Sequence, residues 1–216
     1  MSPRSPDPTV RTELLETAAR ILADEGPTAM STRRLAREVG TSTMAVYTHF
    51  GGKEDLVRAM CVEGFDRLAR RMRRVRSTND PVADCAELGR AYRRHALANP
   101  HLYRIMFGGR TVADYQPGPD DRAYGLTTLT MLADSVGRCI EAGRFAPAEP
   151  FPLAVQLWTV GHGVVSLELD GFFDGGLEGG NALELLAALT VNLISGFGDD
   201  PARAPRSVAR RARQAA

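Results

Sequence analysis

Apolar residues recur at helical spacing along nearly the whole of this 216-residue chain, and proline or glycine residues interrupt the pattern at intervals. The i, i+3, i+4 recurrence indicates amphipathic helices, and no segment shows the strict alternation of a strand. The sequence therefore predicts an all-α fold of about nine helices. The expected helices cover residues 8–25, 32–39, 43–50, 53–76, 81–98, 100–107, 120–144, 151–172 and 180–197.

Capping residues mark the boundaries of the first helices. Asp7 followed by Pro8 suits the start of the first helix, and Ser31 and Ser42 suit the N-caps of the second and third. Gly40 suits the left-handed residue that ends the second helix. The fourth expected helix would extend roughly 36 Å, which is long enough to join two domains.

Charge is distributed unevenly along the chain. Residues 1–76 carry 14 basic and 10 acidic groups, a net charge of +4, whereas residues 77–200 carry 8 and 16, a net charge of −8. Residues 201–216 hold five arginines and no acid. A basic head on an acidic body suggests an anionic partner for the head alone, although ordinary surface scatter would also give this modest excess.

Several classes of protein are disfavoured. Cys61, Cys85 and Cys139 lie far apart, without metal or redox spacing, so a reduced setting is expected. The first residues lack the apolar centre of a signal peptide, and no apolar run reaches the roughly 18 residues of a membrane span. No phosphate-binding loop, dinucleotide motif, hydrolase motif or metalloprotease motif occurs. We expect a cytoplasmic protein that is not an enzyme and has no cofactor, metal or membrane partner.

The short helix expected at residues 43–50 lies in an arrangement typical of helix-turn-helix proteins, because about three residues that include Gly40 join it to the helix before it. Val46 and Phe50, four residues apart, would hold it on the first two helices. Its opposite face could enter the major groove of DNA, where hydroxyls bond base edges or phosphates and methyl groups meet thymine methyls. That face carries Thr43, Met44, Tyr47 and Thr48. The basic residues around it are Arg33, Arg34, Arg37 and Lys53, which can meet phosphates. The pattern alone also fits an ordinary helical bundle.

The stretch STRRLAREVGTSTMAVYTHFGGKEDL, residues 31–56, resembles the TetR-type transcriptional regulators. The shared pattern includes the Tyr-x-His-Phe ending at Phe50 and the Lys-Glu-x-Leu that begins at Lys53. The resemblance implies a DNA-binding domain over residues 8–70, with its helix-turn-helix at 31–50. A ligand-binding and dimerisation domain over residues 80–198 would follow, and the composition of residues 199–216 predicts a disordered basic tail.

The resemblance also implies roles for the matching residues. The expected phosphate contacts are Thr32, Tyr47, His49 and Lys53, and Arg33 is expected to reach a base or a phosphate. The positions that read bases are Thr43, Met44, Ala45 and Thr48. Thr41 departs from the family pattern, which has an apolar residue there. Because the reading face lacks Arg, Gln and Asn, base discrimination is expected to lean on apolar contacts and on Arg33.

Two later stretches, NPHLYRIMFG at residues 99–108 and WTVGHGVVSLELDGFF at 158–173, resemble one subgroup of the family, which is named for a Trp-x-x-x-His-Gly pattern. Large aromatic side chains with adaptable methionines suit a small apolar or aromatic effector, although the same residues could simply fill a core. The expected ligand-binding residues are Tyr103, Met106, Phe107, Met131, Leu132, Trp158 and His162.

The helix expected at residues 180–197 is apolar nearly all round and must be covered on two sides. The core can cover one side and a second copy of the chain the other. The expected interface residues are Leu185, Leu189 and Leu193.

The sequence thus favours a homodimeric repressor that binds a near-palindromic operator in double-stranded DNA and is released by a small effector. Two alternatives stay open. One is a DNA-binding regulator that needs no ligand, and the other is a helical carrier or enzyme with a vestigial head. An operator-binding assay separates the last from the rest.

Overall fold

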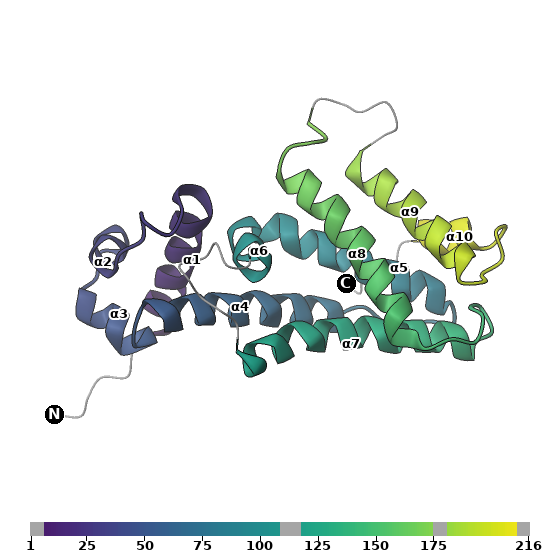
Figure 1. Ribbon diagram of the computed structural model, residues 1–216, viewed down its shortest axis with the longest axis horizontal. Coiled ribbons are helices and arrows are strands. Elements are labelled where there is room, and N and C mark those ends of the chain that lie inside the picture. The colour runs from purple at the N-terminus through teal and green to yellow at the C-terminus, as the bar shows by residue number, and fades with distance from the viewer. Residues whose placement is uncertain (1–6, 109–117, 175–180, 211–216) are drawn as a thin grey trace. The chain divides into compact units, whose positions relative to one another are not determined.

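The structure is a computed structural model that describes residues 7–108, 118–174 and 181–210. These residues form ten α-helices and no strand, which confirms the predicted all-α fold (Figure 1). None of the helices in the described part is long and apolar enough to cross a membrane. The helices are α1 Pro8–Glu25, α2 Thr32–Val39, α3 Thr43–Phe50, α4 Lys53–Arg73, α5 Pro81–Ala98, α6 Pro100–Phe107, α7 Pro119–Glu141, α8 Pro150–Leu169, α9 Ala182–Gly196 and α10 Ala204–Ala209.

The chain divides into two compact units. Unit 1 consists of Met1–Asp66 and Asn99–Tyr124, and unit 2 of Arg67–Ala98 and Gly125–Ala216. This division differs from the predicted domain limits, because α6 packs against α1 and so joins the N-terminal helices. Helix α4 begins in unit 1 and ends in unit 2, as expected of a connecting helix.

The core of unit 1 is built from the apolar stripes of its short helices. Helix α1 contacts α2 and α6, and α2 contacts α3. Each helix contributes buried side chains to one continuous cluster, so the three N-terminal helices are fixed by a shared core rather than by separate pairs. Its members include Leu14, Leu15, Ile21, Leu35, Val46, Phe50, Leu102 and Ile105.

The predicted capping residues hold the ends of these helices. The Asp7 carboxylate accepts a hydrogen bond from the backbone N–H of Thr9 at 2.9 Å, and the Ser31 hydroxyl accepts from that of Arg34 at 3.2 Å. Gly40 adopts φ = +72°, the left-handed conformation that favours glycine at a helix end. The first three helices therefore begin and end at the predicted residues.

Unit 2 has its own core, in which α5 packs against α8 and α10 while α9 packs against α8 and α10 (Figure 1). Cys85 and Cys139, which are far apart in the sequence, meet in this core. A hydrogen bond with Cys85 and burial raise the pKa of the Cys139 thiol far above its ordinary range. The thiol therefore stays protonated and packs as a small apolar side chain.

The C-terminal segment corrects one expectation. The sequence predicts a disordered tail over residues 199–216, whereas residues 204–209 form α10 and pack into the unit 2 core. The buried guanidinium of Arg144 holds this segment, donating to both carboxylate oxygens of Asp199 at 2.6 and 2.8 Å and to the Ser207 hydroxyl at 3.1 Å. Arg90 adds a hydrogen bond to the carbonyl of Val208 at 2.8 Å. Residues 211–216 lie outside the described residues.

His95 on α5 is fully buried in unit 2. Burial lowers its pKa from 6.5 to about 4, and the positive charges of Arg71 and Arg67 act in the same direction. The imidazole is therefore neutral in the folded protein at neutral pH, and protonating it costs more in the fold than in the unfolded chain.

This difference predicts a loss of stability in mild acid. The unfolded chain binds the proton near pH 6.5 and the fold only near pH 4, so the free energy of unfolding falls as the pH falls between these values. From pH 7 to pH 5 the His95 contribution is about 2 kcal/mol. Urea unfolding at both pH values should show a smaller loss for His95→Gln than for the wild type. An equal loss in the two proteins would contradict this origin.

Candidate nucleic-acid interface

Helix α3 is held on unit 1 by one of its faces. Val46 and Phe50 lie four residues apart and are both buried in the core beneath it. The guanidinium of Arg11 on α1 lies over the Phe50 ring, 5.3 Å from its centroid, which adds a cation–π contact at the edge of the packing. The Ser42 hydroxyl caps the helix by accepting the backbone N–H of Ala45 at 3.1 Å.

The opposite face of α3 is open to solvent. Met44 is 70% exposed and Tyr47 is 50% exposed, and both belong to the group of large apolar side chains that the described part of the chain leaves uncovered. Thr43 and Thr48 are exposed as well, whereas Ala45 and His49 are half-buried. The structure therefore places four of the predicted DNA-binding residues on one exposed surface of α3.

The remaining predicted residues flank this surface on neighbouring helices. Thr32 and Arg33 lie in the first turn of α2, and Lys53 is the first residue of α4. The Lys53 ammonium donates one hydrogen bond to the carbonyl of Pro27 at 3.0 Å, which ties the start of α4 to the turn after α1. Its other two protons stay available to a phosphate.

The arginines of α2 divide into two groups. Arg34 donates to Glu38 at 2.8 Å and to Glu25 at 2.6 Å, and Arg20 also pairs with Glu38. These hydrogen bonds raise the pKa of Arg34 and lower those of Glu25 and Glu38. Arg34, which the sequence groups with the phosphate-facing residues, therefore joins α1 to α2 instead.

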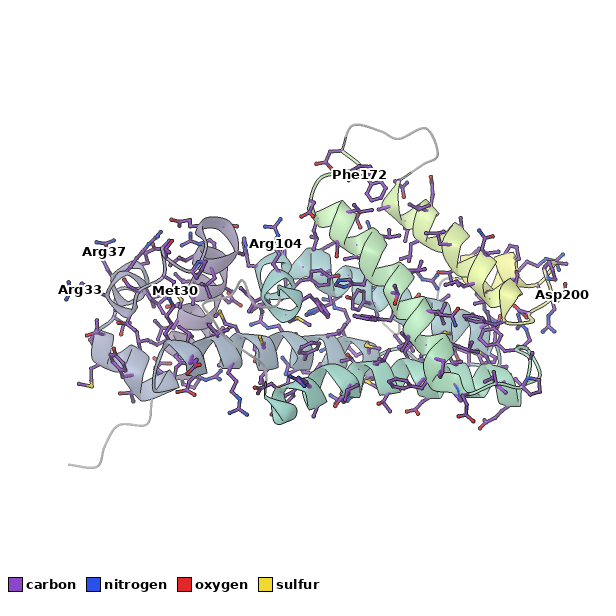
Figure 2. All side chains as sticks on the ribbon, viewed as in Figure 1. Met30, Arg33, Arg37, Arg104, Phe172 and Asp200 are labelled. Atoms are coloured by element: carbon purple, nitrogen blue, oxygen red, sulfur yellow. The ribbon has the colours of Figure 1, made fainter. Side chains whose placement is uncertain are left out.

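Arg33 and Arg37 form the other group. They lie four residues apart and both project outward from α2 (Figure 2). No ion pair links either of them to another residue among those that the structure describes. The positive charge that α2 presents to solvent is therefore concentrated on these two side chains.

The residues predicted to bind an effector fall in both units. Tyr103, Met106 and Phe107 lie in unit 1, where the Tyr103 and Phe107 rings are 4.9 Å apart. The others lie in unit 2, where Leu132 packs at the edge of the core and the Trp158 and His162 rings are 5.3 Å apart. Those unit 2 residues are Met131, Leu132, Trp158 and His162.

His162 has a partner that the sequence did not indicate. Its Nδ1 lies 2.9 Å from the Tyr92 hydroxyl on α5, and burial lowers its pKa. The imidazole is thus neutral at neutral pH and oriented by the phenol. On the same pair of helices, Arg93 donates to Glu168 at 2.7 Å, so these two charges neutralise each other. No spacing in the sequence could have linked Tyr92 to His162, because the two are 70 residues apart.

The predicted interface leucines are not among the exposed apolar side chains of α9. Leu185, Leu189 and Leu193 are half-buried, and the first two pack against a small cluster that contains Val164 and Leu186. The uncovered apolar side chains on α8 and α9 are Phe151, Leu167 and Leu183. The sequence pattern marked α9 as apolar all round but did not single out these three.

No group of three or more histidine, cysteine, aspartate or glutamate side chains in the described ranges is placed to hold a metal ion.

The fold and this surface define a helix-turn-helix protein with a second, helical unit. The chain belongs to the tetR family of bacterial regulatory proteins. The sequence model of that family matches residues 14–60, and the model of the tetracyclin repressor-like C-terminal domain matches residues 85–194. The predicted family is therefore confirmed, and its members are transcriptional regulators rather than enzymes. The Trp-x-x-x-His-Gly subgroup stays a prediction.

Known proteins of this kind resemble the chain over different lengths. The HTH-type transcriptional regulator Rv1816 of Mycobacterium tuberculosis is 29% identical over 141 residues, which cover 62% of this chain and 58% of that protein. A protein of unknown function from Rhodococcus sp. RHA1 has a similar structure, with 25% identity, a TM-score of 0.74, and coverage of 92% of this chain and 100% of its own. AibR in complex with isovaleryl coenzyme A and operator DNA shares the fold, with 21% identity, a TM-score of 0.61, and coverage of 88% and 100%.

The cap that Ser42 forms on α3 leads to a prediction about the stability of the protein. Ser42→Ala removes the acceptor for the Ala45 N–H and should lower the free energy of unfolding by about 1 kcal/mol. Thr43→Ala, one residue later and exposed, makes no capping bond in the described structure and should leave it nearly unchanged. Chemical denaturation of the two variants checks this. A Thr43 variant that loses as much as the Ser42 variant would contradict the capping assignment.

Proposed function

We propose that this protein is a cytoplasmic transcriptional repressor that binds a near-palindromic operator in double-stranded DNA through α2, α3 and the start of α4. One observation carries the proposal. Met44 and Tyr47 are exposed on α3 while Arg33, Arg37 and Lys53 flank them without acidic partners among the described residues. A short helix with uncovered apolar and hydroxyl groups, next to helices that carry these three cations, suits the major groove and its phosphates.

The roles divide by chemistry. Arg33, Arg37 and Lys53 carry the charge that replaces condensed counterions on the phosphates, which makes binding dependent on salt. Thr32, Tyr47 and His49 add hydrogen bonds that set the register of the protein on the duplex. Base edges are left to the residues at the centre of the α3 surface, namely Thr43, Met44, Ala45 and Thr48.

The protein acts as a homodimer in this proposal. Phe151, Leu167 and Leu183 leave apolar surface on α8 and α9, and a second copy of the chain would cover it. Leu185, Leu189 and Leu193 are half-buried and lie on a different side of α9 from Leu183, and they are proposed to take part in the same interface. A two-fold dimer presents two α3 helices, which accounts for a near-palindromic operator.

The effector is proposed to be a small, uncharged apolar or aromatic molecule that binds near Trp158 and His162. Support comes from the chemistry of the group. His162 is hydrogen-bonded to Tyr92 and neutral because burial lowers its pKa, and its ring lies 5.3 Å from that of the only tryptophan of the chain. The neighbouring Arg93 and Glu168 charges are paired with each other and so are not available to an ionic ligand. Such an effector releases DNA only if it binds more tightly to a conformation that cannot hold the operator.

The first test is selection from a pool of random duplexes by the full-length chain. A near-palindrome should be enriched, with half-sites roughly 34 to 36 Å or somewhat more apart, and sedimentation should show two chains per duplex. Lys53→Ala should weaken binding to every duplex by about tenfold, because a phosphate contact carries no sequence information. Arg206→Ala, which removes an exposed charge from α10, serves as the control and should bind normally. Equal affinity for all duplexes at physiological salt would contradict the proposal.

The effector assignment predicts a spectroscopic signal. Apolar and aromatic compounds that release the operator should perturb the emission of Trp158, the only tryptophan, with the same concentration dependence as release. His162→Ala should weaken the effector by about tenfold, through loss of a buried polar contact, while operator binding is retained. Trp158→Phe should remove the signal. Undiminished release in a Trp158→Ala, His162→Ala double variant would place the effector site elsewhere.

A further inference from the structure

The surface of α3 has less hydrogen-bonding capacity than its composition suggests. The Thr48 hydroxyl donates its only proton to the backbone carbonyl of Met44 at 2.9 Å. It can still accept a hydrogen bond, but it cannot donate to the acceptor atoms that guanine and thymine present in the major groove. The Ser42 hydroxyl accepts the N–H of Ala45 as the helix cap and keeps its own proton, but the cap fixes the position of its oxygen. Two of the hydroxyls on and beside the reading surface therefore serve the helix itself.

Met44 stands out on the same surface by its exposure. At 70% it is the most exposed of the large apolar side chains in the described ranges, although it belongs to a well-packed unit. Met44 does not belong to the core of unit 1, because α3 packs there through Val46 and Phe50 on its other face. An unbranched thioether with three rotatable bonds adapts its shape to a contacting apolar group.

The major groove offers one kind of apolar group, the C5-methyl of thymine. We propose that Met44 reads this methyl group in each operator half-site, so that apolar contact rather than hydrogen bonding is the main source of base discrimination on α3. The inference deepens the proposed function and rests on it, because it assumes that α3 enters the groove. The exposed methyl-bearing side chains beside Met44, Thr43 and Thr48, extend the same apolar contact area.

The test removes the methyl group and nothing else. In the highest-affinity duplex recovered from the random pool, each thymine is replaced in turn, symmetrically in both half-sites, by deoxyuridine, which pairs identically but lacks the C5-methyl. At one position the wild-type chain should bind more weakly, because one buried methyl group is lost in each half-site. The expected loss is about fourfold per half-site, or on the order of fifteenfold for the pair. Met44→Ala should bind the thymine and deoxyuridine duplexes equally at that position.

Two further variants make the comparison specific. Met44→Leu keeps an apolar side chain and should retain most of the methyl dependence. Leu126→Ala removes an apolar side chain of α7 that is 52% exposed and lies outside the helix-turn-helix, so it should keep the wild-type ratio. Because Met44 is a surface residue, its replacement should leave the fold intact, which the thermal unfolding curve verifies.

Each other outcome overturns the inference in a distinguishable way. If the wild-type chain selects a specific sequence but no deoxyuridine substitution weakens binding, Met44 does not read a methyl group, and the proposed function stands. Should Met44→Ala show the wild-type methyl dependence, another side chain reads the thymine. If no sequence is enriched at all, the inference and the proposed function both fail.

Discussion

The orientation of α3 depends on the burial of Val46 and Phe50 in the core of unit 1. The two side chains lie on one face, so any rotation of α3 about its axis would bring them into water, at a cost of about 1.5 to 3 kcal/mol each. Once they are buried, Met44 and Tyr47 must face solvent, because residues on the other side of an eight-residue helix have no core to enter. The exposed surface is therefore a consequence of packing rather than of polar contacts.

Charge pairing then decides which cations this unit offers to a partner. Glu25 and Glu38 hold Arg34, and Glu38 also pairs with Arg20, so two acids and two bases of α1 and α2 are used to join the helices. Arg33 and Arg37, one residue before and three residues after Arg34, are left for an anion. Charge pairing also holds unit 2 together, where the carboxylates of Asp80 and Asp199 pair with the buried Arg144. Net charge alone hides this difference, because paired and unpaired arginines count equally.

The features that could be predicted from the sequence are those that local interactions determine, such as the helix caps. Ser31 and Ser42 were recognisable as caps because the bond that each accepts comes from three residues away, and the first helices begin where predicted. Prediction failed where a residue is held by a partner that is distant in the sequence. Arg144 holds Asp199, 55 residues further on, and so orders a segment whose composition is typical of disorder. Glu38, four residues after Arg34, was a partner that the sequence offered, but nothing near Arg34 indicated Glu25 on the preceding helix.

The most direct test of this account is the dependence of operator affinity on salt in three single variants of α2. The slope of log affinity against log salt counts the phosphate contacts, at about 0.9 for each. Arg33→Ala and Arg37→Ala should each reduce the slope by about that amount per bound chain, whereas Arg34→Ala should leave it unchanged because its charge is spent on Glu25 and Glu38. A slope that falls as much for Arg34→Ala as for Arg33→Ala, or that changes for none of the three, would contradict the assignment.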